Sequence, residues 1–186
     1  LDGVTVGDNH IGQAQLTAAI ADLFGVPAVN GSAKATDLTV AKIEVARLDA
    51  NADRNGDATK FNATANLKNG TDAAVAGSLA PENGGYRLRL TQTDLKQGKL
   101  SVALAEPASI HVLGQNLAID SLSLNTGGGR IDARGKIADT LDLAVTIQAL
   151  PLAIANAVRP DLAAGGTIDG NANISGERAN PDIKFS

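Results

Sequence analysis

Apolar and polar residues alternate over most of this chain, in short runs that recur about every 10 to 15 residues, a strand-like period. Typical runs are Tyr86-Leu88-Leu90, Leu100-Val102-Leu104, Leu141-Leu143-Val145-Ile147 and Ile168-Gly170-Ala172-Ile174. The runs are separated by turn signals at Asn55-Gly56, Asn69-Gly70, Asn83-Gly84-Gly85, Gly127-Gly128-Gly129 and Gly165-Gly166. The pattern predicts a mainly β chain of strands joined by tight turns.

At intervals the alternation contains one extra residue. The apolar positions are Leu38, Val40, Ile43, Val45, Leu48 and Ala50 in one segment, and Leu117, Ile119, Leu122 and Leu124 in another. An extra residue is what a β-bulge inserts, and a bulge bends a strand while the same face stays inward. The segments 128–132 and 165–169 also echo each other. We therefore expect an elongated, repetitive, curved or folded β-sheet, like an open β-solenoid groove, around one aliphatic surface.

Two segments have a helical spacing instead: residues 11–24 and 151–159. Leu16 and Ile20 lie four positions apart in the first, and Ile154 and Val158 do so in the second. We therefore expect one or two short helices. The chain divides into 1–30, a strand plus a short amphipathic helix, and 31–186, the curved sheet body, in one continuous structural unit.

The composition makes the buried surface aliphatic. Hydrophobic residues are 44% of the chain but aromatic residues only 2%, so stacking platforms for sugars or nucleobases are scarce. The net charge of −4, without a basic stripe, argues against nucleic acid as a partner. There is no Cys for disulfides or a thiolate zinc site. The alternation predicts these groove-lining residues: Val40, Ile43, Val45, Leu48, Leu88, Leu90, Leu100, Val102, Leu104, Ile110, Val112, Ile119, Leu122, Leu124, Val145 and Ile147.

Candidate chemistry is sparse. His10 and His111 are the only histidines and stand in different sequence contexts. The polar residues of segment 49–57 resemble a calcium loop, but Arg54 and Lys60 stand where an EF-hand needs Gly and Glu. A strand with a polar outer face explains the same two-residue step. Glycine clusters lack phosphate-binding spacing, and no nucleophile elbow occurs. We expect no enzyme activity, no cofactor and no metal.

The last part of the chain carries a family resemblance. It contains Leu150-Pro151-Leu152, then Gly165-Gly166-Thr167-Ile168-Asp169-Gly170, then Ile174-Ser175-Gly176, and closes at Asn180-Pro181. This run resembles the recurrent unit of the TamB family, relatives of the AsmA-like envelope proteins. A Thr commonly follows the Ser-Gly in that family, and here Glu177 stands there. Residues 31–149 match only in style.

The resemblance implies a periplasmic β-body of a Gram-negative bacterium, a β-taco with an aliphatic groove. Its parent would be anchored in the inner membrane by a segment absent here; because the chain begins at Leu1 and has no Met, we expect it to be part of a longer protein. The implied partners are phospholipid acyl chains or unfolded outer-membrane protein strands, and an outer-membrane barrel-assembly protein of the TamA or BamA type. The implied roles are phospholipid transport between the membranes and assembly of autotransporters and other outer-membrane proteins.

Two alternatives remain open on sequence grounds. A structural β-solenoid segment of a bacterial adhesin or autotransporter passenger is also rich in Gly, Asn and Ala and free of Cys. A β-helical polysaccharide enzyme is the third reading, and the scarcity of aromatic residues weakens it.

Overall fold

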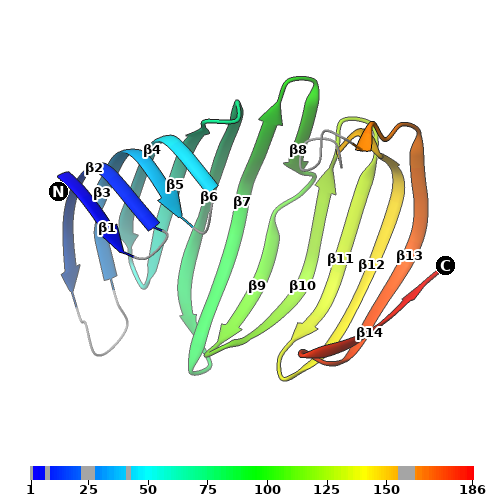
Figure 1. The fold of residues 1–186 in the computed structure, drawn as a ribbon. Coiled ribbons are helices and arrows are strands. Elements are labelled where there is room, and N and C mark those ends of the chain that lie inside the picture. Colours follow the sequence, from blue (N-terminus) through cyan, green and yellow to red (C-terminus); the bar gives the residue numbers. More distant parts are fainter. Residues whose placement is uncertain (1, 7–8, 22–27, 41–42, 155–161) are drawn as a thin grey trace.

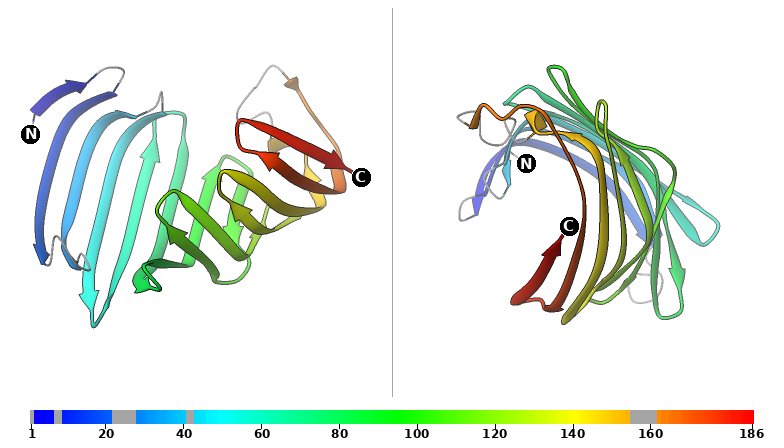
Figure 2. Two further views of the ribbon diagram at one scale, coloured as in Figure 1. Left: turned by 90° about the horizontal axis from the view of Figure 1, so that it is seen from below. Right: turned by 90° about the vertical axis from the view of Figure 1, so that its right-hand side faces the viewer.

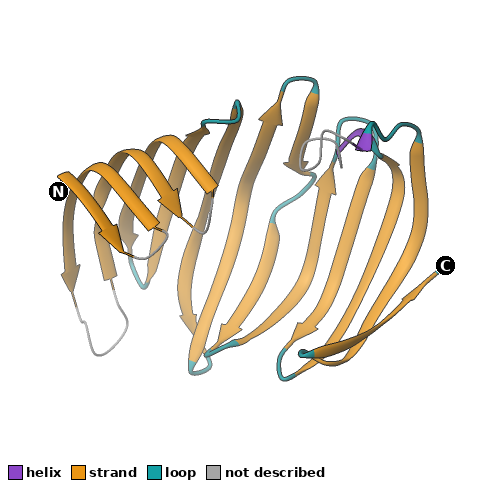
Figure 3. Cartoon of the chain, viewed as in Figure 1, coloured by secondary structure: helices purple, strands orange, loops and turns teal. Residues whose placement is uncertain are grey.

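A computed structural model describes residues 2–6, 9–21, 28–40, 43–154 and 162–186 (Figure 1). Strand accounts for 80% of the structure and helix for 2%, which confirms the mainly β prediction. The described residues form fourteen strands of one antiparallel sheet (Figure 3). Almost every strand pairs with the strand before and after it in the chain, so the sheet is a long meander.

The strands of the first half are β1 (Asp2–Val6), β2 (Asn9–Ala21), β3 (Ala28–Val40), β4 (Ile43–Asn55), β5 (Ala58–Leu67), β6 (Thr71–Glu82) and β7 (Gly85–Gln97). Those of the second half are β8 (Leu100–Leu104), β9 (Ala108–Leu113), β10 (Asn116–Asn125), β11 (Arg130–Ile137), β12 (Thr140–Pro151), β13 (Thr167–Glu177) and β14 (Asn180–Phe185). The short strands β8 and β9 together fill one position, because each pairs with β7 on one side and with β10 on the other.

The helix predicted for residues 11–24 is wrong. Residues 9–21 form strand β2, which pairs with β3 along nearly its whole length, and residues 22–24 lie outside the described part. Leu16 and Ile20 are opposite Ala33 and Val29 in that ladder. A spacing of four residues is a whole number of strand periods as well as about one helical turn, so it fits both structures. The backbone pairing with β3 shows that residues 9–21 form a strand.

Only the beginning of the second predicted helix is described. Ala153 and Ile154 are helical and follow β12 after the turn residue Leu152, whereas residues 155–159 lie outside the described part of the chain. In the described ranges, no helix has the length and hydropathy needed to span a membrane.

The predicted turns and bulges are largely confirmed. Each glycine-containing turn signal separates two strands. The register of β10 against β11 shifts between Ile119 and Leu122, where the apolar spacing widens. A second shift lies in β4, just after Val45, within the other irregular segment. The gap between Val40 and Ile43 has a different origin, since these two residues pair across the connection from β3 to β4.

The sheet is curved and has one layer. Seen end-on, the strands form an arc that is open on one side (Figure 2, right). The contacts between strands are almost all between hydrogen-bonded neighbours. Strands β3 and β5, which are not hydrogen-bonded to each other, share only a few. The accessible surface is 11613 Å², whereas a compact protein of 18.8 kDa would expose about 8,300 Å². The elongated, curved sheet of the sequence prediction is therefore present, and most of its side chains keep contact with solvent.

Candidate functional site: an aliphatic face of the sheet

The register carries one apolar row across the first half of the sheet. Residues directly opposite each other in a ladder project from the same face. Leu48 of β4 is opposite Ala65 of β5, which is opposite Ala73 of β6. Ala73 is opposite Leu95 of β7, and Leu95 is opposite Val102 of β8. The aliphatic face is therefore continuous from β4 to β8.

The same face continues through the second half. Leu88 of β7 is opposite Ile110 of β9, which is opposite Ile119 of β10. Gly135 of β11 follows in the row, and Leu143 of β12 is opposite Gly135. The bulges are necessary for this continuity. Without a bulge, the extra residue in the apolar spacing would turn all apolar residues after it to the other face of the sheet.

This face contains the lining residues that the sequence predicts. The ladders place the following on it: Ile43, Val45, Leu48, Leu88, Leu90, Leu100, Val102, Leu104, Ile110, Val112, Ile119, Leu122, Leu124, Val145 and Ile147. Val40 holds the backbone position opposite Ile43, and its side chain lies outside the described part. That these residues line a binding groove stays a prediction.

The aliphatic face is open to solvent. Among the described residues, the buried hydrophobic side chains are Ala35, Leu38 and Ala108. The other lining residues are half-buried, and Ile43 is 54% exposed. They contact their neighbours in the sheet, and no second layer of described residues covers them. Soluble monomeric proteins rarely expose a large continuous surface of aliphatic side chains to water.

Sequence reasoning missed several members of the face. These are chiefly Leu16, Leu38, Leu67, Leu79, Leu95, Ile183 and Phe185. Leu16 was assigned to a helix, because its four-residue spacing to Ile20 fits a helix as well as a strand. Leu16 and Ile183 are 72% and 61% exposed, so the face is open at both ends of the described sheet.

Two aromatic rings lie against this face where a neighbouring strand has glycine. A Cβ on Gly77 would lie 2.9 Å from Cζ of Phe61, and one on Gly170 would lie 2.5 Å from Cζ of Phe185. Glycine therefore makes room for each ring to lie over the adjacent backbone. The rings add apolar area to the face.

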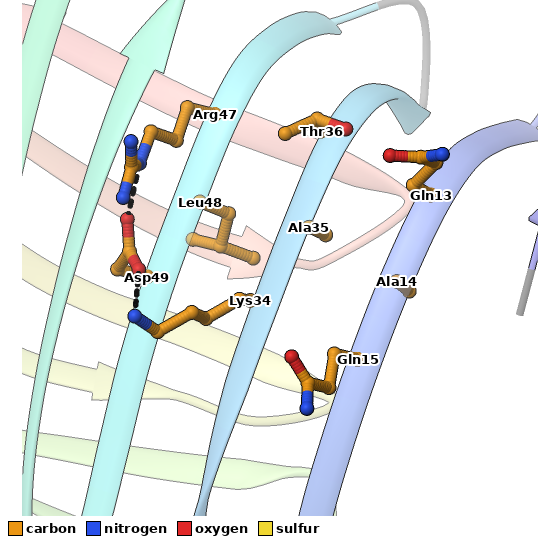
Figure 4. Close-up of a pocket in the computed structure, with 9 residues that line it drawn as sticks. All are labelled: Gln13, Ala14, Gln15, Lys34, Ala35, Thr36, Arg47, Leu48 and Asp49. Atoms are coloured by element: carbon orange, nitrogen blue, oxygen red, sulfur yellow. Dashed lines mark hydrogen bonds and ion pairs between the residues drawn. The ribbon is translucent and has the colours of Figure 1, made fainter.

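The opposite face is polar. Figure 4 shows Lys34, Arg47 and Asp49 on one side of strands β3 and β4, with Leu48 on the other side. Asp49 Oδ2 accepts a hydrogen bond from Arg47 Nε at 2.6 Å, and its Oδ1 lies 3.5 Å from Lys34 Nζ. The hydrogen bond from Arg47 is the main cause that lowers the pKa of Asp49. These residues border a shallow hollow of about 410 Å³ with Gln13. Its cations already have a carboxylate partner.

The calcium-like segment lies on this polar face. Asp49 and Asn51 are in β4, opposite Thr64 and Asn62 of β5, and the Asn55-Gly56 turn follows. The Asn51 side chain bonds to that of Asn62 at 3.3 Å. The interpretation as the polar side of a strand is confirmed. Within the described ranges, no group of three or more potential ligands is placed to hold a metal ion.

The structure does not bring the two histidines together. His10 is in β2 and His111 is in β9, with strands β3 to β7 between them. His111 lies between two carboxylates: Nδ1 is 2.7 Å from Glu82 Oε2, and Nε2 is 3.0 Å from Asp120 Oδ2. Arg87 also donates to Glu82, and this contact is the main cause that lowers the pKa of Glu82. The cluster joins neighbouring strands on the polar face.

A second polar cluster joins β10 to β11. The Ser123 hydroxyl donates to Asp132, and Arg130 Nε lies 2.9 Å from Asp132 Oδ1. The bond from Ser123 comes first, and the one from Arg130 second, among the causes that lower the pKa of Asp132. Both clusters are ion pairs and hydrogen bonds between strands, with His111 of β9 reaching Glu82 of β6 across β7, and such an arrangement supports a sheet.

The geometry therefore assigns the extended apolar surface to one face and most of the charged groups to the other. Comparison with protein-family models, with curated proteins and with solved structures finds no match to this chain.

Proposed function

We propose that this chain is a non-enzymatic module whose aliphatic face shields acyl chains, or nascent outer-membrane protein strands, from water. The observation that supports this proposal is the continuous apolar face, half-exposed from β2 to β14, over which the described residues form no second layer. Burial of apolar surface contributes about 25 cal/mol per Å², so a chain laid along the face gains affinity at each strand it crosses.

The chemistry of the face suits transport more than tight recognition. Its members are mostly Leu, Ile, Val and Ala, with three aromatic residues and a few polar ones such as Thr93 and Gln97, so it offers few directed hydrogen bonds to fix a ligand in one register. A ligand held by non-directional contacts exchanges one set for an equivalent set when it shifts along the sheet. A flexible acyl chain fits such a surface.

The wider context rests on the resemblance of the last part of the chain to the TamB family. On this proposal the parent protein is anchored in the inner membrane, the module lies in the periplasm, and its partner is a barrel-assembly protein of the TamA or BamA type. The process served is outer-membrane biogenesis, by phospholipid transport, by assembly of autotransporters and other outer-membrane proteins, or by both.

The alternative, a structural β-solenoid segment of an adhesin or autotransporter passenger, has less support. A filled solenoid stabilises itself by a buried core between its walls. Here the described strands form one antiparallel layer, in which very few hydrophobic side chains are buried.

The test places the same charge on each face of one strand. Val145 lies on the aliphatic face, and its neighbour Ala144 lies on the polar face opposite Arg134. We expect the purified protein to retain lipid, detected by mass spectrometry after gentle extraction. Val145→Glu should reduce the retained lipid several-fold, whereas Ala144→Glu should leave it unchanged. Equal retention by both variants, or no lipid on the unaltered protein and no binding to added vesicles, would contradict the proposal.

A further inference from the structure

Asn-Gly pairs occur four times in this chain, beginning at Asn30, Asn55, Asn69 and Asn83. In such a pair the main-chain nitrogen of the glycine can attack the side-chain carboxamide carbon of the asparagine, because glycine has no side chain to hinder the approach. The Asn55 side chain lies outside the described part. The structure places the other three asparagines in different surroundings, and these surroundings decide which of them is free to react.

Asn30 is held within strand β3. Its Oδ1 accepts a hydrogen bond from the backbone nitrogen of Arg54 at 2.7 Å. The following residue, Gly31, pairs with Ala18 of β2 on one side and with Ala52 of β4 on the other. A ladder on each side fixes the extended backbone here, so the carboxamide cannot turn toward the Gly31 nitrogen without the loss of these bonds.

Asn69 is held in the connection from β5 to β6. Its Oδ1 accepts a hydrogen bond from the backbone nitrogen of Thr71 at 3.0 Å. The nitrogen of Gly70, which would be the attacking atom, donates to the carbonyl oxygen of Leu67 at 3.1 Å. Ring closure at Asn69 would therefore break both hydrogen bonds before the new bond forms.

Asn83 has neither restraint. Asn83 and Gly84 form the whole loop between β6 and β7, because Glu82 pairs with Gly85. Their φ angles are 46° and 79°, as in a type I′ hairpin turn. Asn83 is exposed, and neither its carboxamide nor the Gly84 nitrogen forms a hydrogen bond with another described residue. Both reacting groups are therefore free.

We propose that Asn83 is a site of spontaneous deamidation. The Gly84 nitrogen attacks Cγ of Asn83, its proton leaves together with the side-chain amide group as ammonia, and a cyclic succinimide remains. Water then opens the ring at either carbonyl group, which gives aspartate or isoaspartate at position 83. The reaction needs no reagent other than water. The inference does not depend on the proposed function.

Isoaspartate at this position would loosen the β6–β7 hairpin. It adds a methylene group to the backbone of a loop whose geometry fits only its present length. The next residue is tightly placed, since a Cβ on Gly85 would lie 2.2 Å from the carbonyl oxygen of Val112 in β9. Glu82, directly before the loop, bonds to Arg87 and lies 2.7 Å from His111 Nδ1. A displaced loop therefore also disturbs the contacts that join β6, β7 and β9.

Peptide mapping by mass spectrometry tests the site. The folded protein and the same protein unfolded in urea are incubated at mildly alkaline pH, and each Asn-Gly peptide is followed for conversion of the amide to a carboxyl group. In urea we expect similar rates at Asn30, Asn69 and Asn83, since glycine follows each. In the folded protein Asn83 should be converted several-fold faster than the other two. A folded-state rate at Asn83 no faster than that at Asn30 or Asn69 would overturn the inference.

Asn83→Gly is the matched control, because Gly-Gly also fits a type I′ loop and has no carboxamide. After the same incubation the unaltered protein should contain isoaspartate at position 83, detected with an isoaspartyl methyltransferase, and its Tm should have fallen. Asn83→Gly should retain its initial Tm. Asn83→Asp introduces the charge without the methylene group, and its Tm should lie above that of the isoaspartate form. An equal fall in Tm for the unaltered protein and Asn83→Gly would overturn the assigned effect on the hairpin.

Discussion

A glutamate at Val145 should leave the sheet folded, because the residue it replaces is only half-buried. Complete burial of a valine contributes about 1.5–3 kcal/mol, so the loss of about half of that burial costs about 1 kcal/mol. The lower strand propensity of glutamate adds up to about 1 kcal/mol. The sum of about 1–2 kcal/mol corresponds to a fall in Tm of about 2–8 °C for a domain of this size.

A covered core would give a different result. A carboxylate buried there without a partner would cost several kcal/mol, against a total stability of about 5–15 kcal/mol. Ala144→Glu is the control, since it gains a cross-strand partner in Arg134 and should change stability by less than about 1 kcal/mol. Urea and thermal denaturation, followed by circular dichroism at pH 7, measure both variants. Gross unfolding of Val145→Glu with a stable control would refute the single open layer.

Three further outcomes are expected. Gly77→Ala should destabilise the sheet more than Gly165→Ala. A Cβ on Gly77 would lie 2.3 Å from the carbonyl oxygen of Arg89, whereas a Cβ on Gly165 meets nothing within 4 Å; urea denaturation compares the two variants. Three carboxyl groups have lowered pKa values: Asp49, Glu82 and Asp132. Their contribution to stability is complete above the unfolded-state carboxyl pKa and is lost as the pH falls through the lower folded-state pKa values. The urea midpoint should therefore fall on acidification in that range. It should fall less in variants that carry the corresponding amide, Asn or Gln, at these positions. Calcium or a chelator should leave the Tm unchanged, because the polar residues of 49–57 lie along a strand and its turn; a rise of several degrees with calcium would contradict this.

The alternation along the chain was sufficient to predict the fold class and the composition of the aliphatic face. Side chains two apart in a strand share a face, so the runs around Val102 and Val145 indicated their own orientation. The extra residue between Ile119 and Leu122 indicated the bulge, because the apolar pattern resumed in the same sense after it. These are local properties, and one sequence contains them.

Contacts between distant segments depend on which strands pair, and the alternation of apolar and polar residues does not indicate the pairing. The strand at residues 9–21 could not be distinguished from a helix without its ladder to β3. The approach of Ile154 to Leu95 joins segments separated by the whole of β8 to β12 in the chain. The contacts of His111 with Glu82 and Asp120 likewise require the register of four strands, β6, β7, β9 and β10. The spacing of residues in the sequence does not predict such contacts.

The continuity of the face has a consequence for how function should respond to mutation. A binding site made of a few polar groups fails when one of them is removed, whereas an extended aliphatic face loses only a fraction of its contacts when one leucine becomes alanine. Leu48→Ala should therefore reduce lipid retention slightly, since its neighbours Ala35 and Ala65 stay in place. Insertion of one residue into a regularly alternating strand is a more severe change. A residue inserted between Val145 and Thr146 of β12 would force the segments on either side onto opposite faces or out of register with β11 and β13. On this reasoning the phase of the alternation, more than the identity of any single lining residue, determines whether the face exists.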